Sequence, residues 1–166
     1  MFSFGYAVSL RIMHPDIDPE DITANIRIQP WRSWRAGEPK ATPKGESLKG
    51  VYTETYWVAN LHKEKTLRSE KKEIEAFLTR QLQRLQRSRS FLKAVRKEGG
   101  RSELFVGLFS EKNVGLELPS SLLGTMAELG IDLALDIYPE VKPHNDLMQP
   151  TRKNVRLISA RPRSGG

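Results

Sequence analysis

Acidic side chains that lie close together in the chain are the first candidates for a catalytic or metal-binding site. One group contains a histidine and four acids, His14, Asp16, Asp18, Glu20 and Asp21. Carboxylate oxygens and an imidazole nitrogen can together bind a divalent cation. The same acids also fit a helix start, because Asp18 can cap the helix and Pro19 tolerates the first helical position. We interpret the group as a helix start and expect no metal site.

A second acidic group would form on the outward face of a sheet if the first, fourth and fifth expected strands are neighbours. It would consist of the acids Glu117, Asp132 and Asp136 together with Arg11. Paired carboxylates can perform acid–base catalysis or hold a cation. However, Asp132 and Asp136 alternate with apolar residues as in any half-solvated strand. A wetted sheet face is the simpler interpretation, and an enzyme or metal binder is an alternative.

Other catalytic signatures are missing from the sequence. There is no GxxxxGK phosphate loop, no GxGxxG, no GxSxG and no HExxH. The chain also has no cysteine, which excludes a thiolate nucleophile and a disulfide framework and fits a reducing compartment. We therefore expect no catalytic residue and no cofactor, and lean against an enzyme without excluding one.

Basic residues suggest nucleic acid as a partner. Arg80, Arg84 and Arg87 are spaced to form a ridge on one helix. The net charge is +7, and the residues after Tyr138 contribute much of it, including Arg152, Lys153 and Arg156. A ridge and a basic tail could follow a phosphate backbone. A solvated helix face is the simpler interpretation, because no aromatic residues for base stacking interleave with the arginines.

Two of the three tryptophans lie in residues 29–50, a segment without periodicity that contains several prolines and glycines. We expect a long loop there. In the simpler interpretation, both indoles cap the edge of the core. In the alternative, Trp34 anchors the loop, while Trp31 stays partly exposed between Arg32 and Arg35 as a contact for a partner, since tryptophan and arginine are enriched in binding hot spots.

The elements that must position these residues follow from periodicity and from helix-end signals. Strands are expected at residues 6–13, 51–61, 104–109, 114–118 and 131–137. Helices are expected from Pro19 to Arg27, from a cap at Ser69 to a stop at Gly99 with a bend near Ser88, and from Pro119 to Gly130. The strands at 104–109 and 114–118 should form a hairpin.

The expected order is βαβαββαβ, which predicts an α+β fold with one mixed or antiparallel sheet and helices on one face. Residues 51–138 have the split βαβ order of a ferredoxin-like sandwich. We expect a single domain over residues 1–138 and a basic, extended tail over residues 139–166. No apolar run is long enough to span a membrane and the N-terminus resembles a strand rather than a signal peptide, so a cytoplasmic protein is expected.

Short motifs also carry a family resemblance. They are Leu10-Arg11-Ile12, Asp18-Pro19-Glu20-Asp21-Ile22-Thr23, Ile28-Gln29-Pro30, Trp34-Arg35-Ala36-Gly37-Glu38, Tyr56-Trp57 and the run from Leu129 to Tyr138. The chain resembles the bacterial family catalogued as domain of unknown function 4279 over about Tyr6 to Tyr138. The resemblance implies a small cytoplasmic domain and supplies no catalytic residues to transfer. The segment before Val51 and the tail after Tyr138 depart from the family's compact pattern.

These observations favour a non-enzymatic binding or regulatory module that acts through protein contacts, such as an immunity or accessory protein. The expected partner is another protein, and no membrane is expected to be involved. Nucleic-acid binding through the tail and the arginine ridge is the alternative from another class.

Overall fold

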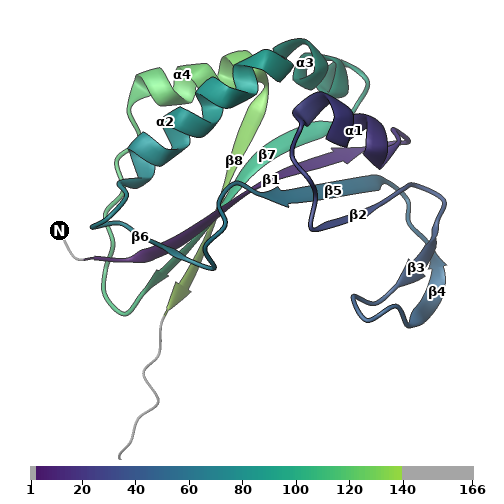
Figure 1. Cartoon of the computed structure of the whole chain (residues 1–166), viewed down its shortest axis with the longest axis horizontal. Helices are drawn as coiled ribbons and strands as arrows, with labels where there is room; N and C mark the ends of the chain where they lie inside the picture. Colours follow the sequence, from purple (N-terminus) through teal and green to yellow (C-terminus); the bar gives the residue numbers. More distant parts are fainter. Residues whose placement is uncertain (1–2, 140–166) are drawn as a thin grey trace, which may run out of the picture.

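The structure, a computed structural model, describes residues 3–139. Its main sheet has six strands and is accompanied by a two-stranded sheet (Figure 1). The strands are β1 (Gly5–His14), β2 (Arg32–Trp34), β3 (Pro39–Ala41), β4 (Ser47–Val51), β5 (Thr55–Asn60), β6 (Leu67–Arg68), β7 (Arg101–Ser110) and β8 (Ile131–Pro139). The helices are α1 (Pro19–Ile26), α2 (Ile74–Leu85), the short η1 (Gln86–Ser88), α3 (Arg89–Lys97) and α4 (Ser120–Leu129).

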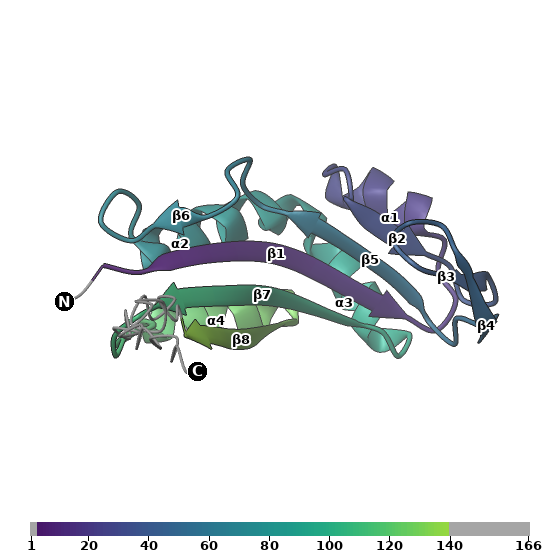
Figure 2. The same ribbon diagram turned by 90° about the horizontal axis from the view of Figure 1, so that it is seen from below.

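The main sheet is mixed and has the order β2-β5-β1-β7-β8, with β6 pairing to the start of β1. β1 lies in the centre and runs antiparallel to both β5 and β7. β7 and β8 are parallel neighbours joined through α4. Figure 2 shows the strands from the side that the helices leave uncovered, with β8 at one margin. The α+β class with a single main sheet is confirmed.

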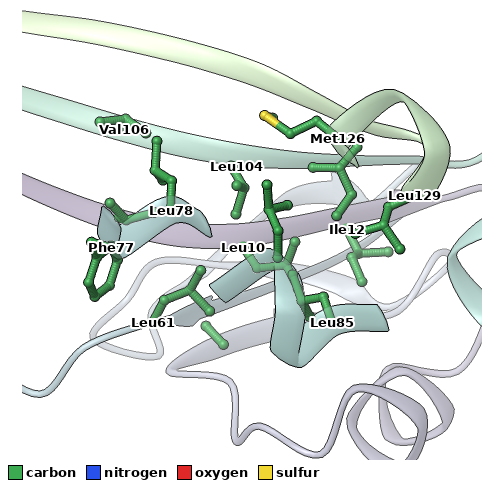
Figure 3. Close-up of a cluster of buried hydrophobic side chains, with 14 of the residues drawn as sticks. Leu10, Ile12, Leu61, Phe77, Leu78, Leu85, Leu104, Val106, Met126 and Leu129 are labelled. Carbon is green, nitrogen blue, oxygen red and sulfur yellow. The ribbon is translucent and has the colours of Figure 1, made fainter. Parts of the chain in front are cut away.

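The helices lie on one face of the sheet and enclose the core with it (Figure 1). Alternate side chains of β1, such as Leu10 and Ile12, are fully buried beneath them. Leu78 and Leu85 of α2 and Leu129 of α4 pack into the same cluster (Figure 3). Burial of each such side chain stabilises the fold by roughly 1.5–3 kcal/mol.

The predicted helix ends at α1 and α4 are confirmed. Asp18 caps α1, because its side chain accepts a hydrogen bond of 2.9 Å from the backbone N–H of Glu20. α4 ends where Gly130 adopts φ 68°, a left-handed conformation that favours glycine. The expected bend near Ser88 is also present, as the 3₁₀ turn η1 between α2 and α3.

Two expectations about the middle of the chain were wrong. Residues 29–50 are not a long loop, since they contain β2 and the β3–β4 hairpin. Ser69 is not the cap of the long helix, which begins later at Ile74. The Ser69 hydroxyl instead accepts a hydrogen bond of 3.1 Å from the backbone N–H of Phe4. The local pattern predicts a helix cap at Ser69, but in the folded chain its side chain bonds to a residue that is distant in sequence.

The expected strand at residues 114–118 is absent, so its hairpin with the preceding strand was also wrong. β7 has β1 on one side and β8 on the other, which leaves no edge for another strand. Val114, Leu116 and Leu118 are partly buried against the core from an unpaired segment. Without this strand, the ferredoxin-like order of residues 51–138 is not confirmed. A split βαβ unit is present. β5 and β7 are connected through α2 and α3 and run parallel to each other, and β1 lies between them.

Candidate functional site

The edge strand β2 places the two tryptophans of residues 29–50. Arg32 and Trp34 lie opposite Val58 and Tyr56 of β5. The backbone N–H of Trp31 donates a hydrogen bond of 3.0 Å to the Val58 carbonyl. The backbone that carries both indoles is therefore held by the main sheet.

An aromatic stack holds the Trp34 indole. Its ring centroid lies 4.4 Å from that of Tyr52 and 4.4 Å from that of Tyr56, with interplanar angles of 16° and 21°. The Arg32 guanidinium lies 5.0 Å from the Trp34 ring. Burial raises the pKa of the Tyr56 phenol and outweighs the lowering by Arg11.

Trp31 is exposed beside this stack. Its side chain is 61% exposed, whereas Trp34 is half-buried. A cleft of about 430 Å³ lies between β2 and the β3–β4 hairpin. Its lining includes Trp31, Arg32, Trp34, Glu38, Pro43 and Tyr52, and we call it the tryptophan cleft.

Arg35, the fourth residue expected here, has a structural role. Its guanidinium bonds the Asp18 carboxylate at 3.0 Å, and its backbone N–H donates to Glu38 at 3.0 Å. The bond to Asp18 connects the turn after β2 to the start of α1, and the bond to Glu38 lies within the turn. Arg35 does not line the cleft.

The four residues of the expected acidic face do not form a cluster. Arg11 pairs with Glu103 at 3.3 Å and lies over the Phe105 ring at 3.4 Å. Asp132 pairs with Arg96 at 3.2 Å. The strand that should have carried Glu117 is absent, and β7 separates β1 from β8.

Asp136 accepts a hydrogen bond from Tyr138, and this bond raises the pKa of the phenol. The carboxylate is therefore engaged by a neighbour on its own strand rather than by the other members of the expected acidic group. Across residues 3–139, no group of three or more His, Cys, Asp or Glu side chains is arranged to hold a metal ion.

The acidic segment before α1 is held by local hydrogen bonds. His14 is buried, and its Nδ1 accepts hydrogen bonds from the backbone N–H groups of Asp16 (3.2 Å) and Ile17 (3.0 Å). An Nδ1 that accepts must be unprotonated, so the hydrogen is on Nε2, which lies 3.4 Å from the Glu98 carboxylate. The imidazole thus shapes the turn after β1.

The arginine ridge is exposed along α2 and η1, as expected. Arg84 donates to the amide oxygen of Gln81 at 3.2 Å, and Arg87 donates to the Ile26 carbonyl at 3.3 Å. Arg80 lines a small hollow with Lys71 and Lys72. The tail residues Arg152, Lys153 and Arg156 lie outside the described residues.

A family model described as a domain of unknown function, number 4279, matches residues 4–140. The chain belongs to this family. No curated protein and no solved structure matches it significantly. The match includes the cleft, which is therefore part of the family domain. None of the helices among residues 3–139 has the length and apolar character needed to cross a bilayer.

Sequence reasoning about this family member missed both tyrosines of the stack. Tyr52 lies just after β4, and Tyr56 belongs to the neighbouring β5. The only signal for them was the high aromatic content of residues 51–61. That segment was predicted to be a single strand. Their convergence on Trp34 depends on β2 pairing with β5, a contact that no local pattern shows.

Proposed function

We propose that the chain is a protein-binding module whose partner contacts the tryptophan cleft. The observation that carries this proposal is the 61% exposed Trp31 indole, held on a fixed backbone beside a cleft. Exposing a large aromatic surface to water is unfavourable, and a partner that buries it supplies a strong contact. Aromatic and arginine side chains dominate the energetics of protein interfaces.

The contacts that hold the walls of the cleft support the same function. Trp34 stacks on Tyr52 and Tyr56, and the Tyr52 hydroxyl bonds the backbone of Ala41 in β3. The sheet, the stack and the hairpin are thereby connected. A preformed surface loses little conformational entropy on binding.

The charges of the cleft favour a protein over a polyanion. Arg32 and Glu38 both line it, so its polar groups have both signs. A surface that tracks a phosphate backbone would be uniformly basic. Mixed charges are typical of the polar rim of a protein interface.

The test compares the wild-type full chain with two variants in quantitative pull-downs from its native cell. Trp31→Ala should reduce the amount of partner recovered at least tenfold and leave the melting temperature unchanged. Leu48→Ala, a similarly exposed apolar residue on β4, is the matched control and should retain the partner. Equal recovery with all three chains would contradict the proposal.

Trp34→Ala separates anchoring from binding. Because Trp34 stacks on two rings, its truncation should destabilise the fold by roughly 2 kcal/mol and lower the melting temperature by several degrees. Differential scanning calorimetry measures both effects. A stability loss of the same size in Trp31→Ala would leave only a structural role for both indoles.

A further inference from the structure

We propose that the free edge of β8 pairs with the β8 edge of a second copy of this chain, which gives a two-fold dimer with one continuous sheet. β8 ends the strand order and, among the described residues, has a strand only on the β7 side (Figure 2). One side of this nine-residue strand is thus open to pairing. Long unprotected edges attract other strands.

Exposed apolar side chains follow this edge. By register with β7, Leu133, Leu135 and Ile137 share the helix-covered face with Leu104, Val106 and Leu108. Ile137 is 68% exposed and Leu135 48% exposed, although their neighbours on β7 are buried. Leu123 of α4 is also exposed beside the start of β8. Among residues 3–139, no element covers this part of the apolar face.

A groove with several apolar lining residues lies on the same edge, near the start of β8. It has a volume of about 400 Å³, and Leu123, Met126 and Leu133 are among the residues that line it. In an antiparallel pair centred on Leu135, Leu133 lies opposite Ile137 of the second copy. Each Ile137 then projects beside the groove of the other copy, and the two-fold axis makes both contacts equivalent.

Charge disfavours the two neighbouring registers. Centring the pair on Ala134 would place Asp132 opposite Asp136 of the second copy, and centring it on Asp136 would oppose two identical carboxylates. Like charges directly opposite one another destabilise a sheet. Centring on Leu135 places Asp136 opposite Ala134 and Asp132 opposite Tyr138, so no carboxylate faces another. The same register overlaps the full length of β8.

The basic tail is also compatible with this arrangement. Residues after Tyr138 include six basic side chains and two acidic ones. In the antiparallel pair, the two Pro139 residues lie at opposite ends of the shared ladder, about 26 Å apart for eight steps of ~3.3 Å. Such a separation exceeds the screening length of about 8 Å at physiological salt. The tails therefore begin too far apart for strong repulsion.

The first experiment measures the mass of the full chain by light scattering after size exclusion. We expect twice the chain mass of 18.9 kDa. Ile137→Lys should give a monomer with an unchanged far-ultraviolet circular dichroism spectrum. Val51→Lys, which changes an exposed apolar residue on β4, should stay dimeric. A monomeric wild-type chain at every soluble concentration overturns the proposal, including the case in which its own C-terminal segment covers the edge.

The second experiment tests the register and uses the absence of cysteine from the chain. Leu135→Cys places two sulfurs at the two-fold axis, where the Cα separation of about 4.5–5.5 Å suits a disulfide. Mild oxidation should link this variant. Tyr138→Cys is a matched exposed position whose two copies lie about 20 Å apart, so it should stay unlinked. Equal cross-linking of the two variants, or none in Leu135→Cys, overturns the proposed pairing.

Discussion

Buried polar groups in this protein depend on particular partners, and Trp57 is a clear case. Its side chain is fully buried at the centre of β5, so its indole N–H cannot reach water. The N–H donates to the Thr23 hydroxyl at 2.9 Å, and that hydroxyl donates to the Pro19 carbonyl at 3.0 Å. One hydroxyl of α1 thus satisfies the indole and connects the helix to the sheet.

Thr23→Val should destabilise the fold by about 1–3 kcal/mol, because it leaves the Trp57 N–H buried without an acceptor. Urea unfolding monitored by tryptophan fluorescence measures the loss. Thr125→Val is the control, since the Thr125 hydroxyl also bonds the carbonyl four residues earlier. Among the described residues, no side chain donates to the Thr125 hydroxyl, so this change should cost much less. Equal losses would contradict the role of Thr23.

The raised pKa of Tyr6 predicts that the folded state loses stability at alkaline pH. Burial, with a smaller effect of Glu64, raises the pKa of its phenol from 10.0 to about 12. The neutral form is therefore favoured in the folded state, and its contribution is fully present below pH 10. As the pH rises from 10 towards about 12, the unfolded chain ionises first and stability falls.

Chemical denaturation across this pH interval tests the expectation. Tyr6→Phe removes the ionising group together with its hydrogen bond to the Lys72 carbonyl, and should flatten the alkaline slope while lowering stability at neutral pH. An unchanged slope in Tyr6→Phe would assign the alkaline loss to other groups.

At the scale of elements, α4 connects β7 to β8 and has a glycine within it and another at its end. Gly124 lies inside the helix, and a Cβ added there would meet nothing within 4 Å outside the helix's own backbone. Gly130 ends the helix with φ 68°, and a Cβ there would lie 3.3 Å from Arg96. The same residue type therefore has opposite consequences at two nearby positions.

Gly124→Ala should raise the free energy of unfolding by about 0.5–1 kcal/mol, because alanine loses less backbone entropy in a helix. Gly130→Ala should lower it by roughly 1 kcal/mol or more, since a left-handed conformation is unfavourable for a side chain with a Cβ. Thermal unfolding of the two variants beside the wild type measures the signs. Stabilisation by both changes would contradict the assigned helix end.

At the scale of the molecule, the two proposed surfaces lie at opposite edges of the main sheet. The tryptophan cleft adjoins β2, and the proposed pairing edge is β8 at the other end of the strand order. A β8-paired dimer would therefore leave both clefts free. Two clefts in one particle could bind a repeated partner more tightly than one cleft can, through effective concentration alone.

The charge of the whole chain predicts weak, salt-sensitive attraction to nucleic acid. Retardation of DNA or RNA at low salt should disappear by physiological salt, because few phosphates are neutralised. Replacing Arg152, Lys153 and Arg156 by Gln should remove it more completely than replacing Arg80, Arg84 and Arg87. Gel-shift titrations over a salt series measure both effects. Binding that persists at physiological salt would favour nucleic acid over protein as the partner.

The sequence by itself determined the elements that local physics controls. The strand β1, the Asp18 cap, the bend near Ser88 and the Gly130 stop all follow from neighbours within a few residues, and each is confirmed. The α+β class and the family were likewise readable from such local patterns. These features need no knowledge of which segments meet in space.

Only the tertiary structure decided which strands pair and which side chains meet. The alternating residues 114–118 fit a strand, but β1 and β8 already occupy both sides of β7. The tryptophan cleft depends on β2 joining β5, which brings Tyr52 and Tyr56 to Trp34. Likewise, Asp132 met Arg96 rather than the other acids. Pairing is a competition among distant segments for the same edge, and a local pattern carries no information about its competitors.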